Sequence, residues 1–220
     1  MHIVYDGAPF SGKTASIQSL SRLLERPVVS PEVHNGRTLL FDWMEYQGGV
    51  RYGRPIVCRV ITVPGQADLA HRRIRLLRSA DGIIFVVDSA REAFGRTLEQ
   101  WSNLQVLLAR WKLETTVTLQ INKRDAGDAV PVQEVLDRFG KERVVQHFKT
   151  EAIHDRGTRE AFVLTAGQVL RDLEKRGGLR RHLTETQPVQ AIDAEQLAEI
   201  LRDEPSAEAA NQRALPVTEE

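Results

Sequence analysis

A short stretch near the start of the chain carries the residue types that bind phosphate. Residues 7–14 read Gly-Ala-Pro-Phe-Ser-Gly-Lys-Thr, which matches the pattern GxxxxGK[ST]. The stretch follows the apolar run His2 to Tyr5 and opens a segment with helical spacing that continues to Leu24. A strand, a glycine loop and a helix in that order aim backbone N–H groups and the positive helix end at a di- or triphosphate. The order therefore predicts a phosphate site rather than an ordinary glycine turn.

The chemistry of this stretch divides among its positions. Lys13 is expected to reach the β- and γ-phosphates of a nucleotide, and the Thr14 hydroxyl to take one position on Mg²⁺. The other phosphate contacts are expected from the loop and the first helical turn, at Gly7, Ser11, Gly12 and Ala15.

A second motif predicts which base is bound. Asn122-Lys123-Arg124-Asp125 follows the apolar run 117–121 and matches the NKxD motif of Ras-like GTPases. Asp125 would accept hydrogen bonds from N1–H and the exocyclic amine of guanine, which adenine cannot supply. Asn122 would contact N7 or hold the loop, the Lys123 stem would cover one ring face, and Ala152 would offer its N–H to O6. A site built to pair with such groups strongly rejects a base that lacks them.

A third segment, residues 62–66, reads Thr-Val-Pro-Gly-Gln where Ras-like proteins usually have Asp-x-x-Gly-Gln. The Gly65 N–H is expected to sense the γ-phosphate, and Gln66 to position the attacking water. Thr62 stands in place of the acid that normally holds a Mg²⁺-bound water. Asp42 or Asp88 is therefore a candidate to replace that acid through water.

The motifs together resemble the MglA group of bacterial Ras-like GTPases, over roughly residues 1–175. The resemblance rests on the segments 37–42 (Arg-Thr-Leu-Leu-Phe-Asp), 62–66 and 122–125. It implies a switch that hydrolyses GTP slowly, controls cell polarity or motility by recruiting partners in its GTP form, and is stimulated by a roadblock-type (MglB-like) activator. It also implies that Arg37 is an intrinsic arginine finger. Thr38 is expected to complete the Mg²⁺ coordination when a γ-phosphate is present.

The elements that position these motifs follow from the alternation of apolar runs and helical segments. This alternation predicts an α/β fold, with a mostly parallel, roughly six-stranded mixed sheet flanked by helices. The resemblance implies that this fold is a Ras-like P-loop domain. Strands are expected at 2–6, 38–46, 55–62, 82–88, 116–121 and 144–149, and helices at 13–25, 68–79, 92–112, 131–139 and 157–175. The glycine-rich stretch 47–54 predicts an antiparallel hairpin at one sheet edge. The apolar run 83–87 is expected at the sheet centre, and the tryptophans of the third helix in the core.

Composition narrows the class of protein. The chain has 220 residues, and its 30 basic and 30 acidic residues cancel, which gives no bias toward nucleic acid or anionic membrane. The single cysteine, Cys58, excludes an intramolecular disulfide and is expected to be an inert core residue. No stretch is long and apolar enough to span a bilayer, so we expect a cytoplasmic protein, with recruitment to a cell pole or a membrane-associated complex as an option. Residues 1–177 are expected to form the GTPase domain, and 178–220 an extension with one short helix (190–203) and a disordered tail.

Alternatives remain open at this stage. A scaffold locked to GTP or GDP with negligible hydrolysis would use the same motifs. A P-loop ATPase or kinase is a second rival, against which Asn122 and Asp125 argue. The basic run 71–78 is either a solvated helix face or a surface for an acidic partner or lipid.

Overall fold

The computed structural model describes residues 1–29, 41–51, 53–63, 70–140 and 144–177. The chain divides into a unit of residues 1–186 and a unit of residues 187–220, and none of the second unit is described. The expected domain boundary at 177 and the short helix at 190–203 therefore stay predictions. Four predicted site residues also lie outside the described residues, namely Arg37, Thr38, Gly65 and Gln66.

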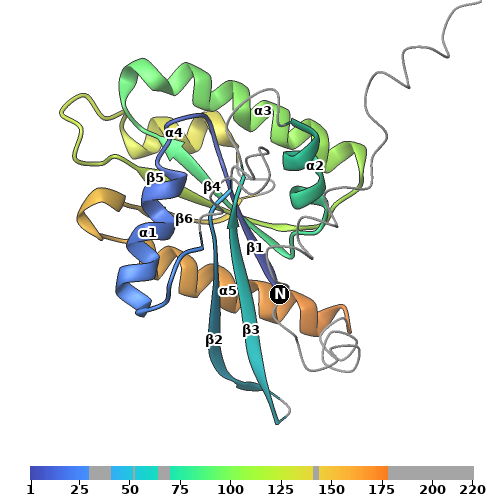
Figure 1. Ribbon diagram of the computed structural model, residues 1–220. Helices are drawn as coiled ribbons and strands as arrows, with labels where there is room; N and C mark the ends of the chain where they lie inside the picture. The colour runs from blue at the N-terminus through green and yellow to red at the C-terminus, as the bar shows by residue number, and fades with distance from the viewer. Residues whose placement is uncertain (30–40, 52, 64–69, 141–143, 178–220) are drawn as a thin grey trace, which may run out of the picture. The chain divides into compact units, whose positions relative to one another are not determined.

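Six strands form one mixed sheet in the order β2-β3-β1-β4-β5-β6 (Figure 1). β2 and β3 pair antiparallel, and the other neighbouring strands pair parallel. The predicted α/β fold is confirmed, and the carboxyl ends of the parallel strands meet at one edge of the sheet. The strand bounds are β1 (His2–Asp6), β2 (Trp43–Arg51), β3 (Arg54–Thr62), β4 (Gly82–Asp88), β5 (Thr116–Asn122) and β6 (Val144–Lys149).

Helices cover both faces of this sheet. α1 and α5 contact each other and lie on one face, while α3 and α4 contact each other on the opposite face (Figure 1). Each helix ends within two residues of its predicted bounds. The bounds are α1 (Lys13–Leu24), α2 (Ala70–Arg78), α3 (Phe94–Arg110), α4 (Val132–Phe139) and α5 (Thr158–Lys175), with short 3₁₀ turns η2 (Arg91–Ala93) and η3 (Ala152–His154). None of the helices in the described part of the chain has both the length and the apolar character needed to cross a membrane.

The predicted strand at 38–46 is wrong in its bounds. β2 begins at Trp43 and continues through the glycine pair to Arg51, so most of the predicted connection 47–54 is strand. The reason is a β-bulge: the register with β3 shifts between Gln47 and Val50, and Gly49 has φ 68°. A glycine at positive φ can place an extra residue within a ladder, so the Gly48-Gly49 pair bends the strand instead of reversing it.

The core has one layer on each side of β4, whose seven residues are all buried. On the α3 and α4 side, Phe85 packs edge-on against Trp101 with ring centroids 5.1 Å apart, and Phe139 lies 5.2 Å from Trp101. On the α1 and α5 side, Cys58 is 1% exposed within an apolar cluster that includes Phe162. The predicted positions of the central strand, of Trp101 and of Cys58 are confirmed. Trp111, also expected in the core, lies just after α3 and is only partly buried, with the Arg78 guanidinium 5.4 Å from its ring centroid.

Candidate nucleotide-binding site

The phosphate loop connects β1 to α1, and two glycines fix its path. Gly7 has φ 147°, and a Cβ there would lie 2.5 Å from the carbonyl oxygen of Val86 in β4. Gly12 has φ 101°, and a Cβ there would lie 2.2 Å from Nδ2 of Asn122. Both positions therefore require glycine on conformational and steric grounds. The loop packs closely against β4 and against the segment predicted to read the base.

The first turn of α1 carries backbone N–H groups that no described side chain caps. Gly12 is the N-cap residue of this helix. The first N–H groups of a helix lack intrahelical partners, and their dipoles sum to a partial positive charge. Thr14 is exposed at this end and Ala15 is half-buried, while the Ser11 hydroxyl is buried without a hydrogen-bond partner among the described residues. The residues present thus fit an anionic group at this end of α1.

Lys13 places its ammonium over the loop. Its Nζ donates to the carbonyl oxygens of Gly7 at 2.9 Å and Ala8 at 2.8 Å, and the residue is 7% exposed. Burial lowers the pKa of Lys13 to about 8, with the negative charge of Asp6 acting in the opposite direction and the positive charge of Arg73 in the same one. A cation with so little solvent gains strongly from an incoming anion, because the anion replaces the hydration that burial removed.

A series of buried hydrogen bonds connects the phosphate loop to the sheet. Gln120 of β5 donates from Nε2 to the Ser16 hydroxyl at 2.6 Å, and that hydroxyl donates to the Gly12 carbonyl oxygen at 2.8 Å. Gln120 lies where a buried parallel strand usually carries an apolar side chain. These two hydrogen bonds connect β5 to the first turn of α1.

Asn122 joins the phosphate loop to the base-side segments. Its Nδ2 donates to the Ser11 carbonyl oxygen at 3.0 Å, and its Oδ1 accepts from Thr150 Oγ1 and from the Ala152 N–H at 3.0 Å each. The side chain is 2% exposed. The structure thus brings the phosphate loop, 111 residues away in sequence, together with the segments at 122 and 150–152. The Ala152 N–H is paired with Asn122 here, so its predicted contact with guanine O6 stays a prediction.

The rest of the NKRD motif forms a shaped loop after β5. Lys123 has φ 60°, and its ammonium lies 2.7 Å from the carboxylate of Asp88, which also accepts from the Ala90 N–H at 3.1 Å. Asp88 is therefore engaged on the base side of the site. Asp125 is exposed, with His154 Nε2 at 3.8 Å. A solvent-facing carboxylate at this position is available for a base.

Thr62 is the last residue of β3, and its neutral side chain bonds to the backbone just before β2. Its hydroxyl accepts from the Asp42 N–H at 2.9 Å, and its own N–H donates to the Asp42 carbonyl oxygen at 2.8 Å. The residue is 3% exposed. Its side chain thus has a structural role in joining the ends of β2 and β3.

Three residues in or beside the phosphate loop were not predicted from the motifs. Phe10 is 87% exposed at φ 63°, a conformation rare for a bulky side chain. Asp6 and Arg73 form a buried ion pair beside the loop. Asp6 directly precedes the glycine loop, so its place in the sequence was a visible signal. Its partner Arg73 gave no such signal, because it lies 67 residues away in sequence.

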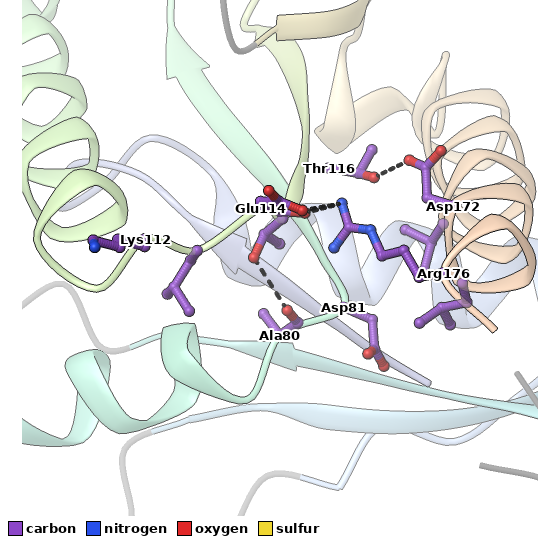
Figure 2. A pocket seen from close by; sticks show the side chains of 11 residues that line it. Ala80, Asp81, Lys112, Glu114, Thr116, Asp172 and Arg176 are labelled. Atoms are coloured by element: carbon purple, nitrogen blue, oxygen red, sulfur yellow. Dashed lines mark hydrogen bonds and ion pairs between the residues drawn. The ribbon is translucent and has the colours of Figure 1, made fainter. Parts of the chain in front are cut away.

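A separate cavity of about 310 Å³ lies at the opposite edge of the sheet (Figure 2). It is lined by residues just before β4, at the start of β5 and near the end of α5. Its polar groups are engaged with each other: Thr116 donates to Asp172 at 2.6 Å, and Arg176 donates to the Glu114 carbonyl oxygen. This cavity is not the site predicted from the motifs, which lies at the carboxyl ends of the strands.

Comparison with known proteins identifies the class to which this geometry belongs. The model of the ADP-ribosylation factor family matches residues 53–168, which is more than half of the chain. The chain belongs to the ADP-ribosylation factor family. As a member of that family it is a small GTPase, and guanine nucleotide is its ligand. The family match includes the NKRD segment that the structure ties to the phosphate loop.

A relative of this ADP-ribosylation factor family member is similar to it over a larger share of the chain. The chain is 29% identical over 182 residues to the mutual gliding-motility protein MglA of Myxococcus xanthus (strain DK1622). The alignment covers 80% of the chain and 93% of that protein. The MglA-type resemblance seen in the motifs is confirmed.

Proposed function

We propose that this GTPase is a polarity or motility switch that binds GTP and GDP with Mg²⁺ and recruits partners in its GTP form. We further propose that hydrolysis is slow alone and is accelerated by a roadblock-type activator. The assignment to motility is supported by the similarity to MglA of Myxococcus xanthus, whose name records a role in gliding motility.

One observation carries the nucleotide assignment: the Asn122 side chain bonds both the phosphate loop and the Ala152 segment. This amide keeps the phosphate cradle and the base-reading carboxylate of Asp125 at a fixed separation. A ligand with phosphates at one end and guanine at the other fits such an arrangement. The second hydrogen on Asn122 Nδ2 is then able to reach N7 of the base.

The proposed catalytic and metal roles follow the motifs. Lys13 neutralises phosphate charge, Gln66 positions water and Arg37 stabilises the transferring phosphoryl group. Thr14 and Thr38 would hold Mg²⁺, which supplies charge neutralisation between the β- and γ-phosphates.

A second candidate function is a scaffold that holds GTP or GDP without turning it over. The Thr62 geometry favours it, because the hydroxyl at the usual acid position is occupied with the Asp42 backbone. Without that acid, the metal would be held less firmly and turnover would fall. Intact GTP after prolonged incubation with an activator would support the scaffold.

The base assignment is tested by changing the hydrogen-bond character of one side chain. Asp125→Asn replaces an acceptor pair with a group that also donates, so it suits xanthine, which carries an oxygen in place of the guanine amine. We expect GDP affinity to fall by at least about a hundredfold and xanthosine diphosphate affinity to rise. Asp128→Asn, which changes an exposed carboxylate in the same loop, is the matched control. Unchanged preference for GDP in Asp125→Asn, or tighter binding of ATP than GTP by the unmodified protein, would refute the assignment.

The catalytic roles are tested by GTP turnover of Arg37→Ala and Gln66→Leu with a roadblock-type activator present. Loss of turnover in both variants with GTP binding retained is the expected result. Equal rates in all three proteins would remove both residues from the mechanism.

A further inference from the structure

A carboxylate without solvent contact lies directly before the phosphate loop. Asp6 is the last residue of β1 and is 0% exposed. Arg73 of α2 holds it with two parallel bonds, Nε to Oδ1 at 2.9 Å and Nη2 to Oδ2 at 2.7 Å. The Arg73 side chain is itself only 12% exposed. This pairing is the fork geometry that arginine, and not lysine, provides.

A third element holds the same guanidinium. With the amide of Gln100 oriented to satisfy both groups, its oxygen accepts from Arg73 Nη2 at 3.0 Å. Gln100 belongs to α3, so Arg73 connects α2 to both β1 and α3. α2 follows the segment 62–66 that was assigned to the γ-phosphate.

The pair lies next to the group that is expected to serve the phosphates. Asp6 directly precedes Gly7, whose carbonyl oxygen accepts from the Lys13 ammonium at 2.9 Å. An unpaired buried carboxylate at this place would repel a di- or triphosphate. We expect such repulsion, in a site with little solvent, to weaken binding by about tenfold or more.

We propose that Arg73 is a positioning residue that neutralises Asp6 and thereby allows the phosphate loop to hold a nucleotide. The inference rests on the phosphate-loop assignment made under the proposed function. A consequence is that any partner that pulls α2 away from β1 uncovers the Asp6 charge and releases the nucleotide. The buried ion pair thus couples the position of α2 to nucleotide affinity.

The test compares GDP and GTP affinity, the rate of GDP release and thermal unfolding for four proteins. These are the unmodified chain, Arg73→Gln, Asp6→Asn and the double variant Asp6→Asn/Arg73→Gln. Arg73→Gln should bind GDP at least about tenfold more weakly and GTP more weakly still, because GTP carries one more charge. The double variant should bind GDP within about threefold of the unmodified chain, since both charges of the ion pair are removed together and no unpaired carboxylate is left beside the loop. Arg91→Gln, which breaks an exposed pair with Glu134, is the control and should change neither.

The outcomes separate the possible failures. If the unmodified chain binds no guanine nucleotide, the proposed function fails. If it binds and Arg73→Gln binds equally well, the positioning role is refuted. If Arg73→Gln weakens binding and the double variant is as weak, Arg73 acts only as a mechanical link and the neutralisation is refuted. Melting curves without nucleotide verify that each variant is folded at the assay temperature.

Discussion

The contact between Gly12 and Asn122 allows a quantitative test of how the two halves of the site are joined. In Gly12→Ala the new methyl group would meet Nδ2 of Asn122, since the ideal Cβ lies 2.2 Å from that atom. The backbone at φ 101° adds strain of about 1 kcal/mol for an L residue. Moving the amide away breaks its bonds to Ser11, Thr150 and Ala152, each of which contributes about 1 kcal/mol. The free energy of unfolding should therefore fall by about 4 kcal/mol.

A double-mutant cycle isolates the clash from the strain. Asn122→Ala alone loses the three bonds and should cost about 3 kcal/mol, and it also removes the atoms that the new methyl group would meet. Gly12→Ala in that background should then cost only the backbone strain, about 1 kcal/mol. The two substitutions should be non-additive by about 3 kcal/mol, measured by urea unfolding in the absence of nucleotide.

Gly177→Ala is the control for strain. Gly177 has φ 67° and nothing described within 4 Å of its ideal Cβ, so alanine there should cost only about 1 kcal/mol. The reasoning is refuted if Gly12→Ala is no more destabilising than Gly177→Ala. Additive costs in the cycle would also refute it, because they would mean that the Asn122 amide does not limit the space at Gly12.

Three further predictions concern stability. Burial lowers the pKa of Lys13 to about 8 in the folded protein, against about 10.4 in an unfolded chain, so the unfolded state binds more protons between these values. In the absence of nucleotide, the free energy of unfolding should therefore rise between pH 8 and about 10.5, by up to about 3 kcal/mol relative to the variant Lys13→Met. Parallel pH profiles of stability for the two proteins would contradict this expectation. Tyr5→Phe should stabilise the protein by about 1 kcal/mol in urea, because the Tyr5 hydroxyl is buried with no hydrogen-bond partner among the described residues; a loss of stability would show that the hydroxyl is satisfied. Phe139→Ala should cost about 4 kcal/mol by the same measurement, since its ring packs on Phe85 and Trp101; a cost under about 1 kcal/mol would place the ring outside the core.

The sequence by itself determined the order of the elements and the chemistry of the site. The apolar run of β4 could only be a central strand, because a strand buried on both faces has no polar side to alternate with. The glycine loop and the NKRD motif were recognisable because their function depends on residue types at fixed spacing along the chain. Local patterns of this kind can be recognised without knowledge of the fold.

The tertiary structure decided the features that depend on residues distant in sequence. The Gly48-Gly49 pair has the same composition in a turn and in a bulge, and only its pairing with β3 makes it a bulge. Thr62 gave no sign of its bonds to Asp42, and Asp6 gave none of its partner on α2. Asn122 holds the loop, one of the two roles that its motif allowed, because folding places Ser11 and Ala152 on either side of its amide. Hydrogen bonds and ion pairs between distant segments form because folding brings the strand ends together at one edge of the sheet. Neighbouring residues in the chain do not specify which ends meet.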